Sequence, residues 1–241
     1  MEILNYIWEF YLYIPLFNFL VWLYLTYSWF NLGISVIILT ILLRFALLPF
    51  SILTEKGKLV SMNLGKEVAE IKKDFANDPV KQKQMIRNLL KKKKIRPWAK
   101  AIVLGVQGLV LLLLYQVFLG GINTEAKLHL LYPDIPRPDF INTKFLWFDI
   151  AQQDLVASAL VAGYIFAQSL IGAYNRKGKL SKKEQIFLIF FPAFIFLILA
   201  VLPSVKSIFV LTSFIFSSII SMFTAIIKIM ITQAKKKPQS S

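Results

Sequence analysis

Arg44 is the residue whose position in the chain most needs a chemical explanation. It lies well inside the apolar stretch GISVIILTILLRFALLPFS (residues 33–51), which is long enough to cross a bilayer as a helix. A cation at the centre of a membrane helix costs at least about 2.5–3.5 kcal/mol, so such charges usually serve a function. Thr40 shares the helical face of Arg44. Arg44 is therefore either a functional cation or a side chain that snorkels to the cytoplasmic headgroups, and this residue alone favours neither interpretation.

A second polar stripe is expected in the last apolar stretch, residues 207–231. Polar residues follow one another there at spacings of three or four, which places them on one helical face. They are Ser213, Ser217, Ser221, Thr224 and Lys228. Hydroxyls in membrane helices often serve only close packing, but this row is longer than packing usually needs. Together with Arg44, Thr40 and the amide of Gln107, they would line a hydrated cavity within the bilayer.

The composition argues against several other kinds of chemistry. The chain has no cysteine, and its single histidine, His129, has no cluster of acidic residues around it in the sequence. We therefore expect no metal site and no cofactor. The net charge of +15 is segregated between apolar stretches, which favours lysines that face anionic lipid over sequence-specific binding of nucleic acid. Ribosomal RNA remains open as a charge partner, because phosphate contacts need no sequence motif.

The polar residues must be held by a helical membrane framework. The chain is 241 residues long and 57% hydrophobic, which predicts an all-α polytopic membrane protein with five transmembrane helices. We expect these helices at residues 32–53, 99–120, 154–174, 185–203 and 207–231. The segments between them are an external or interfacial aromatic segment (1–31), a cytoplasmic helical hairpin (54–98), an external loop (121–153), a cytoplasmic loop (175–184) and a basic cytoplasmic tail (232–241).

The distribution of lysine and arginine predicts the orientation. Segment 54–98, segment 175–184 and the tail are rich in both residues, whereas 1–31, 121–153 and 203–206 are poor in them. The positive-inside rule then places the N-terminus outside and the C-terminus in the cytoplasm.

The first 31 residues are dense in Trp and Tyr, which suits the membrane–water interface. No lysine or arginine precedes Arg44, so we expect no cleaved signal peptide. We interpret residues 14–30 as an interfacial helix on the outer surface. The alternative is a sixth span, which would place an acidic N-terminus in the cytoplasm.

The order of these features resembles the YidC/Oxa/Alb family of membrane-protein insertases over nearly the whole chain. The stretch ILTILLRFALLPFS is similar to the first conserved span of that family, in which a proline follows a single arginine by five residues. Further similar positions are Ser61-Met62, Asp78-Pro79, Pro97, Gln107, the string FLWFDIAQQD (145–154), Pro192, Pro203 and Ser204. None of these motifs is specific by itself, but their order and spacing are.

The resemblance implies an insertase or chaperone of the bacterial plasma membrane that acts through a hydrophilic groove open to the cytoplasm and to lipid. Its partners would be nascent membrane-protein chains and the bilayer, with a Sec-type translocon and the ribosome as further candidates. No covalent step is required, so we do not expect an enzyme. The implied client-binding residues are Arg44, Thr40, Gln107, Ser213, Ser217, Ser221 and Thr224.

The 54–98 hairpin carries almost half of the 28 lysines and arginines. Its two amphipathic helices separate at Asn77, Asp78 and Pro79, where the aspartate suits an N-cap and the proline the first helical position. Salt-sensitive contacts with ribosomes, anionic lipid or client chains are expected at these cations, and a solvated connector is the alternative. The cations expected to make contacts are Lys72, Lys73, Lys81, Lys83 and Arg87.

Two other classes of function stay open on the residues alone. A small transporter or channel would explain polar residues in the membrane, but it predicts paired intramembrane acids or inverted repeats, and the sequence has neither. A membrane scaffold would dock a cytoplasmic partner on its cationic hairpin while Arg44 merely snorkels. Whether Arg44 can be replaced without loss of function tests the scaffold alternative.

Overall fold

The computed structural model describes residues 2–92, 97–174 and 182–236, and most of the chain within these ranges is helical. These residues form two compact units. The first unit comprises Met1–Arg44 and Gly108–Ile215, and the second comprises Phe45–Gln107 and Phe216–Ser241. The all-α polytopic fold expected from the sequence is confirmed.

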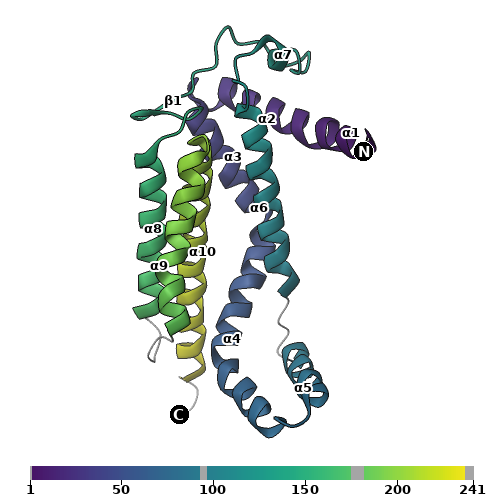
Figure 1. Cartoon of the computed structure of the whole chain (residues 1–241), viewed down its shortest axis with the longest axis vertical. Helices are drawn as coiled ribbons and strands as arrows, with labels where there is room; N and C mark the ends of the chain where they lie inside the picture. Colours follow the sequence, from purple (N-terminus) through teal and green to yellow (C-terminus); the bar gives the residue numbers. More distant parts are fainter. Residues whose placement is uncertain (1, 93–96, 175–181, 237–241) are drawn as a thin grey trace. The chain divides into compact units, whose positions relative to one another are not determined.

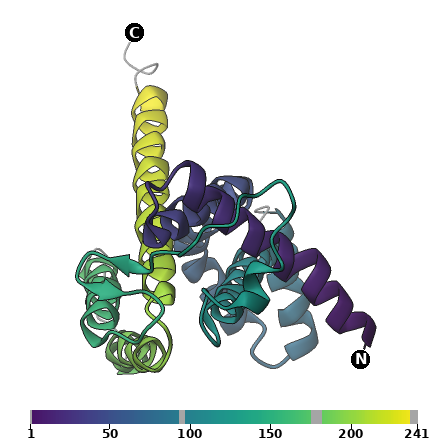
Figure 2. The same ribbon diagram turned by 90° about the horizontal axis from the view of Figure 1, so that it is seen from above.

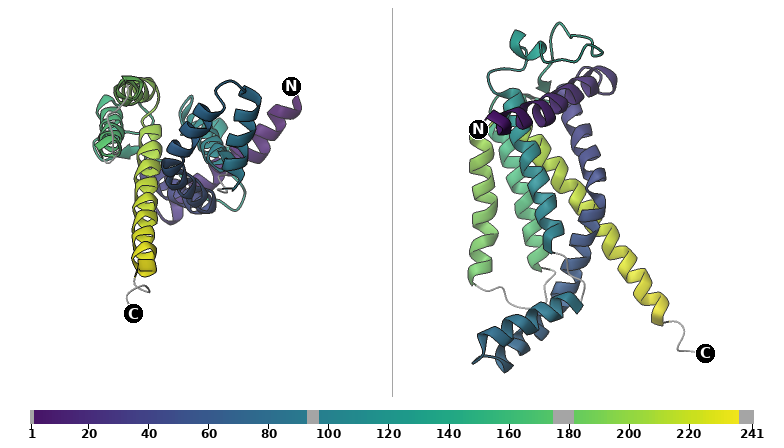
Figure 3. Two further views of the ribbon diagram at one scale, coloured as in Figure 1. Left: turned by 90° about the horizontal axis from the view of Figure 1, so that it is seen from below. Right: turned by 90° about the vertical axis from the view of Figure 1, so that its right-hand side faces the viewer.

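The first unit begins with one helical run across its N-terminal residues. Helix α1 (Glu2–Tyr6), a π-helical turn η1 (Ile7–Tyr13) and helix α2 (Ile14–Thr26) join without a break in helical backbone angles. Within this unit, the run is oriented across the direction of the long helices (Figure 3).

Helix α3 (Leu32–Ala46) follows after a turn, and the side chain of Asn31 accepts a hydrogen bond from the backbone N–H of Gly33 at 3.0 Å. Such a cap satisfies one of the free donors at a helix start.

The rest of the first unit contains the end of α6 (Pro97–Phe118), a short helix α7 (Glu125–Leu128), α8 (Leu155–Tyr174), α9 (Lys182–Val201) and the start of α10 (Val205–Lys236). Helices α8 and α9 lie side by side (Figures 1 and 2). The sequence did not predict a small antiparallel hairpin of β1 (Lys144–Phe145) and β2 (Phe148–Asp149), which precedes α8.

The second unit contains the charged hairpin of α4 (Leu48–Asp74) and α5 (Pro79–Lys92), which pack against each other (Figure 1). The two helices separate at the residues that the sequence predicted. Asp78 caps the start of α5, since its Oδ1 atom accepts a hydrogen bond from the backbone N–H of Lys81 at 3.0 Å. The amide of Gln82 donates to the carbonyl of Lys72 at 3.2 Å and so ties the two helices together.

The expected helix boundaries need three corrections. The span at 32–53 is not one helix, because α3 ends at Ala46 and α4 begins at Leu48. Pro49 in the first turn of α4 lacks an N–H, and in a continuous helix its ring would clash with the carbonyl four residues earlier, which explains the break. Helix α9 starts inside the expected 175–184 loop, and α10 continues to Lys236, so residues 232–236 of the expected tail are helical. Residues 175–181 and 237–241 lie outside the described residues.

Five helices in the described chain are long and apolar enough to cross a membrane, and the broken pair Leu32–Ala46 with Leu48–Thr54 makes a sixth if it is one span. The set differs from the expected one, since the N-terminal run passes this test and α3 passes only with its continuation. The candidate spans are Ile7–Thr26, Trp98–Phe118, Leu155–Tyr174, Glu184–Val201 and Val205–Ile227.

Gly33 is the position where α3 meets the β1–β2 hairpin. A Cβ atom added there would overlap the ring of Phe145. We expect Gly33→Ala to lower the free energy of unfolding by about 1–3 kcal/mol, as overpacking usually does, measured as a lower thermal midpoint in detergent. The matched control is Gly163→Ala in α8, where an added Cβ meets nothing within 4 Å and helix propensity favours alanine. Equal midpoints for Gly33→Ala and the wild type would contradict this packing.

Candidate functional site

Arg44 and Thr40 are both buried on α3. Arg44 lies in the last turn of the helix, and its side chain is only 5% exposed. A cation at this end is favourable, because the last carbonyl groups of a helix lack intrahelical partners and carry partial negative charge. Thr40 is completely buried, and its hydroxyl donates to the carbonyl of Val36 at 2.6 Å. That bond satisfies the hydroxyl donor within the helix, and the hydroxyl oxygen can still accept a hydrogen bond.

The expected stripe on α10 contains hydroxyls in different environments. Ser213 is 4% exposed, and its Oγ atom makes no hydrogen bond to any described residue. Thr224 is half-buried, and its hydroxyl donates to the carbonyl of Ile220 at 2.8 Å. A hydroxyl that serves only helix packing would make the same bond within its own helix. Ser217 is half-buried and Ser221 is exposed. The side chain of Lys228 lies outside the described residues.

The seven expected groove residues are divided between the two units. Arg44, Thr40 and Ser213 belong to the first unit, where all three are buried. The second unit holds the other four, which are Gln107, Ser217, Ser221 and Thr224. A single groove that contains all seven residues therefore stays a prediction.

The cations expected to make contacts on the hairpin are all exposed on the second unit. Three of them lie on α5 and two at the end of α4. Their ammonium and guanidinium groups are accessible to phosphates or carboxylates of a partner. These residues are Lys72, Lys73, Lys81, Lys83 and Arg87.

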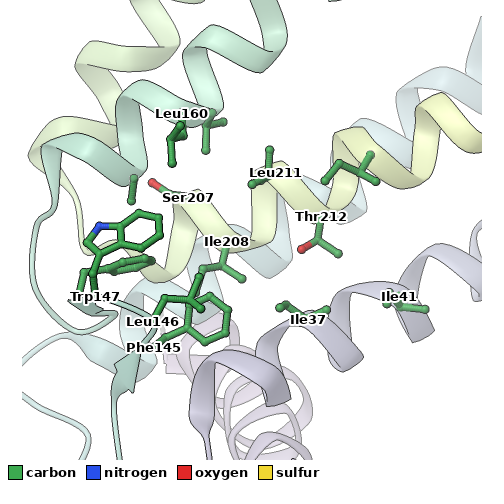
Figure 4. A pocket seen from close by; sticks show the side chains of 14 residues that line it. Ile37, Ile41, Phe145, Leu146, Trp147, Leu160, Ser207, Ile208, Leu211 and Thr212 are labelled. Carbon is green, nitrogen blue, oxygen red and sulfur yellow. The ribbon is translucent and has the colours of Figure 1, made fainter.

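The first unit also contains an apolar pocket of about 410 Å³, which the sequence did not predict. Figure 4 shows α3 side chains facing α10 side chains across it, with the aromatic β1–β2 hairpin at one end. Its volume lies within the range typical of sites that bind small apolar groups. Ser207, one of its few polar lining residues, is 2% exposed, and its Oγ atom has no hydrogen-bond partner among the described residues. Other lining residues are Ile37, Ile41, Leu160, Ile208 and Leu211.

Lys206 is a buried cation that sequence reasoning missed. It was counted only as part of the short connection 203–206, yet its side chain is 3% exposed. Its Nζ atom lies 4.0 Å from the centre of the Tyr115 ring on α6, which is a cation–π distance. The available signal was its spacing, since Lys206 precedes Ser213 by seven residues and extends the α10 stripe by two turns.

Two side chains fix the 121–153 loop to the helices of the first unit. The Nζ atom of Lys127 donates to the carbonyls of Val117 at 2.5 Å and Leu119 at 2.6 Å, and so caps the end of α6. Burial lowers the pKa of the Lys127 ammonium below its usual value. Asn18, the fifth residue of α2, donates to the carbonyl of Leu130 at 2.9 Å and accepts from the backbone N–H of Tyr132 at 2.7 Å.

Comparison with known proteins gives consistent similarities. A family model described as "60Kd inner membrane protein" matches residues 22–235. A "Membrane protein insertase YidC" of Clostridium tetani is 26% identical over 152 residues, which cover 62% of this chain and 60% of the relative. A protein of the same description from Fusobacterium nucleatum is 31% identical over 128 residues, which cover 52% of this chain and 53% of the relative. One from Clostridium perfringens is 29% identical over 106 residues, 44% of each chain. The chain thus spans about half the length of the curated relatives it matches.

Proposed function

The chain belongs to the 60Kd inner membrane protein family, and from that premise we propose that it is an insertase for nascent membrane proteins in a bacterial plasma membrane. The chain itself is a multi-pass membrane protein. The physical task of an insertase is to bring the polar tail of a client across hydrocarbon, where backbone and acidic groups lose their hydration. Polar side chains that replace part of the lost water would lower that barrier.

The burial of Arg44 is the observation that supports this proposal best. A snorkelling arginine keeps its charged head in the headgroup region, exposed outside the protein. Arg44 is instead only 5% exposed, on the same helical face as the buried Thr40. The cation is thus kept within the protein, where a charge acts more strongly than it does in water.

In the proposed mechanism, Arg44 attracts a carboxylate of the client tail while the client's apolar segment moves into lipid. Thr40, Gln107 and the α10 hydroxyls would supply hydrogen bonds along the way. The apolar pocket between α3, α8 and α10 would offer the apolar segment a surface in the same unit as Arg44. The cycle has no covalent step and needs no cofactor.

We also propose that α2 lies in the outer interface, with the N-terminus outside and the C-terminus in the cytoplasm. The middle of a spanning helix lies roughly 15 Å from the headgroups, because the hydrocarbon core is about 30 Å thick. Asn18, near the middle of the candidate span Ile7–Thr26, instead bonds to the backbone of the polar 121–153 loop. A position beside that loop fits a helix on the membrane surface better than a sixth span.

The hairpin of α4 and α5 would provide the contact with partners at the cytoplasmic face. Its exposed lysines suit client chains, anionic lipid and ribosomal RNA alike, and a Sec-type translocon is a further candidate partner. Because exposed charges are screened by salt, these contacts should weaken as the ionic strength rises.

Reconstitution tests the proposed function. Vesicles that contain the purified protein are expected to protect the external tail of a single-span client from protease several-fold more often than protein-free vesicles. Equal protection with and without the wild-type protein would refute the insertase proposal.

A variant of the hairpin tests its role in partner contact. Replacing Lys72, Lys73, Lys81, Lys83 and Arg87 by glutamine should slow insertion at low salt and remove most of its salt dependence. A variant that keeps the wild-type rate and salt dependence would make the hairpin a connector.

A further inference from the structure

Lys206 is a buried cation that has no anionic partner in the described part of the chain. Its side chain is 3% exposed at the start of α10. The Nζ atom lies over the face of the Tyr115 ring, 4.0 Å from the ring centre. No carboxylate of the described residues forms an ion pair with it. An aromatic face offsets only part of the cost of removing an ammonium group from water. An anion brought to this position would therefore be bound favourably.

Helix geometry places Lys206 and Ser213 on the same side of α10. Seven residues make nearly two full turns, so the two side chains point in directions that differ by about 20° and lie about 10 Å apart along the axis. The Ser213 hydroxyl is also buried and has no hydrogen-bond partner among the described residues. A buried ammonium group and a buried hydroxyl that lacks a hydrogen-bond partner among the described residues thus follow one another along one helix face, in the same unit as Arg44 and Thr40.

We propose that Lys206 is a second anion-binding position of the insertase, which receives an aspartate or glutamate carboxylate of the translocating client tail. The proposal rests on the proposed insertase function and extends it to a second cation. A lysine suits this role, because its ammonium is a compact charge on a flexible stem that can leave the Tyr115 ring and return. The position would favour clients with acidic tails over clients with neutral tails.

Zero-length crosslinking tests this contact directly. A carbodiimide activates the client carboxylate, the Lys206 amine attacks the activated carbonyl, and an amide forms with release of the urea. The probe is a client whose tail carries one aspartate, added to vesicles that contain the full-length protein, and mass spectrometry locates the amide. We expect a crosslink at Lys206 with this client and none when the aspartate is replaced by asparagine. Crosslinks to other lysines only would overturn the proposal.

Insertion assays provide the second readout. Lys206→Met should lower the ratio of acidic-tail to neutral-tail insertion several-fold, and Lys206→Arg should restore most of that ratio while forming no amide crosslink. Tyr115→Leu separates a structural role, since it removes the aromatic contact but keeps the charge. If Tyr115→Leu alters the ratio as much as Lys206→Met does, Lys206 serves helix packing and the proposal fails.

The remaining outcomes also decide between explanations. If Lys206 bound a lipid phosphate, Lys206→Met would slow both clients equally, and only in vesicles with anionic lipid. That result would overturn the proposal. An unchanged ratio in Lys206→Met, with active wild-type protein, would refute the second position and leave the insertase function intact. A wild-type protein that inserts neither client would refute the insertase function itself.

Discussion

Arg44→Glu is expected to lower the ratio of acidic-tail to neutral-tail client insertion at least about tenfold. At an effective dielectric constant of about 20, two unit charges 4 Å apart interact by about 4 kcal/mol. Charge reversal turns this attraction into a repulsion of similar size, whereas a tenfold change in rate needs only about 1.4 kcal/mol. The measurement is protease protection of paired clients in vesicles with matched amounts of each variant. Neutral-tail clients report on folding and on the rest of the insertion path.

Two further substitutions of Arg44 distinguish a functional cation from a side chain that only snorkels. Arg44→Lys should keep much of the acidic-tail preference, because the proposed role is a positive charge and not a two-pronged hydrogen-bonding group. Arg44→Leu should lose that preference. A snorkelling arginine predicts the opposite, since leucine would only make the span more apolar. If Arg44→Leu inserts both clients at the wild-type rates, the charged groove is wrong for this protein.

The features that the sequence predicted correctly depend on local chemistry. The hairpin break at Asp78 follows from the capping preference of aspartate and from the fixed backbone angle of Pro79, which act within a few residues. The shared face of Arg44 and Thr40 follows from helical spacing alone. The all-α membrane fold follows from the length and apolar composition of the helices.

Two of the features that were missed depend on residues far apart in the chain. The close contact of Gly33 with Phe145 joins positions separated by more than one hundred residues, and no local sequence pattern predicts it. The contact of Lys206 with Tyr115 also joins two helices far apart in the chain, although the spacing of Lys206 from Ser213 was a local signal. The end of α3 at Ala46 was predictable in principle, because Pro49 was visible, but a proline is also tolerated inside membrane helices.

Asn18→Leu is expected to lower the free energy of unfolding by about 2–3 kcal/mol. The substitution leaves the carbonyl of Leu130 and the N–H of Tyr132 without their partner, and each partly buried group loses hydrogen-bond energy on the order of 1 kcal/mol or more. The asparagine is 1% exposed, so water cannot readily replace it. Thermal unfolding in detergent measures the loss, and protease sensitivity of the 121–153 loop should rise with it.

The same substitution decides where α2 lies. If α2 crosses the bilayer, leucine in place of a mid-span amide removes a polar group from hydrocarbon and should raise stability or leave it unchanged. If α2 lies at the interface beside the external loop, the lost hydrogen bonds dominate and stability falls. Asn5→Leu is the matched control, because Asn5 is exposed on the same N-terminal helical run, and there we expect a change within about 0.5 kcal/mol. A stabilised Asn18→Leu variant with an unaltered loop would favour the sixth span and reverse the proposed position of the N-terminus.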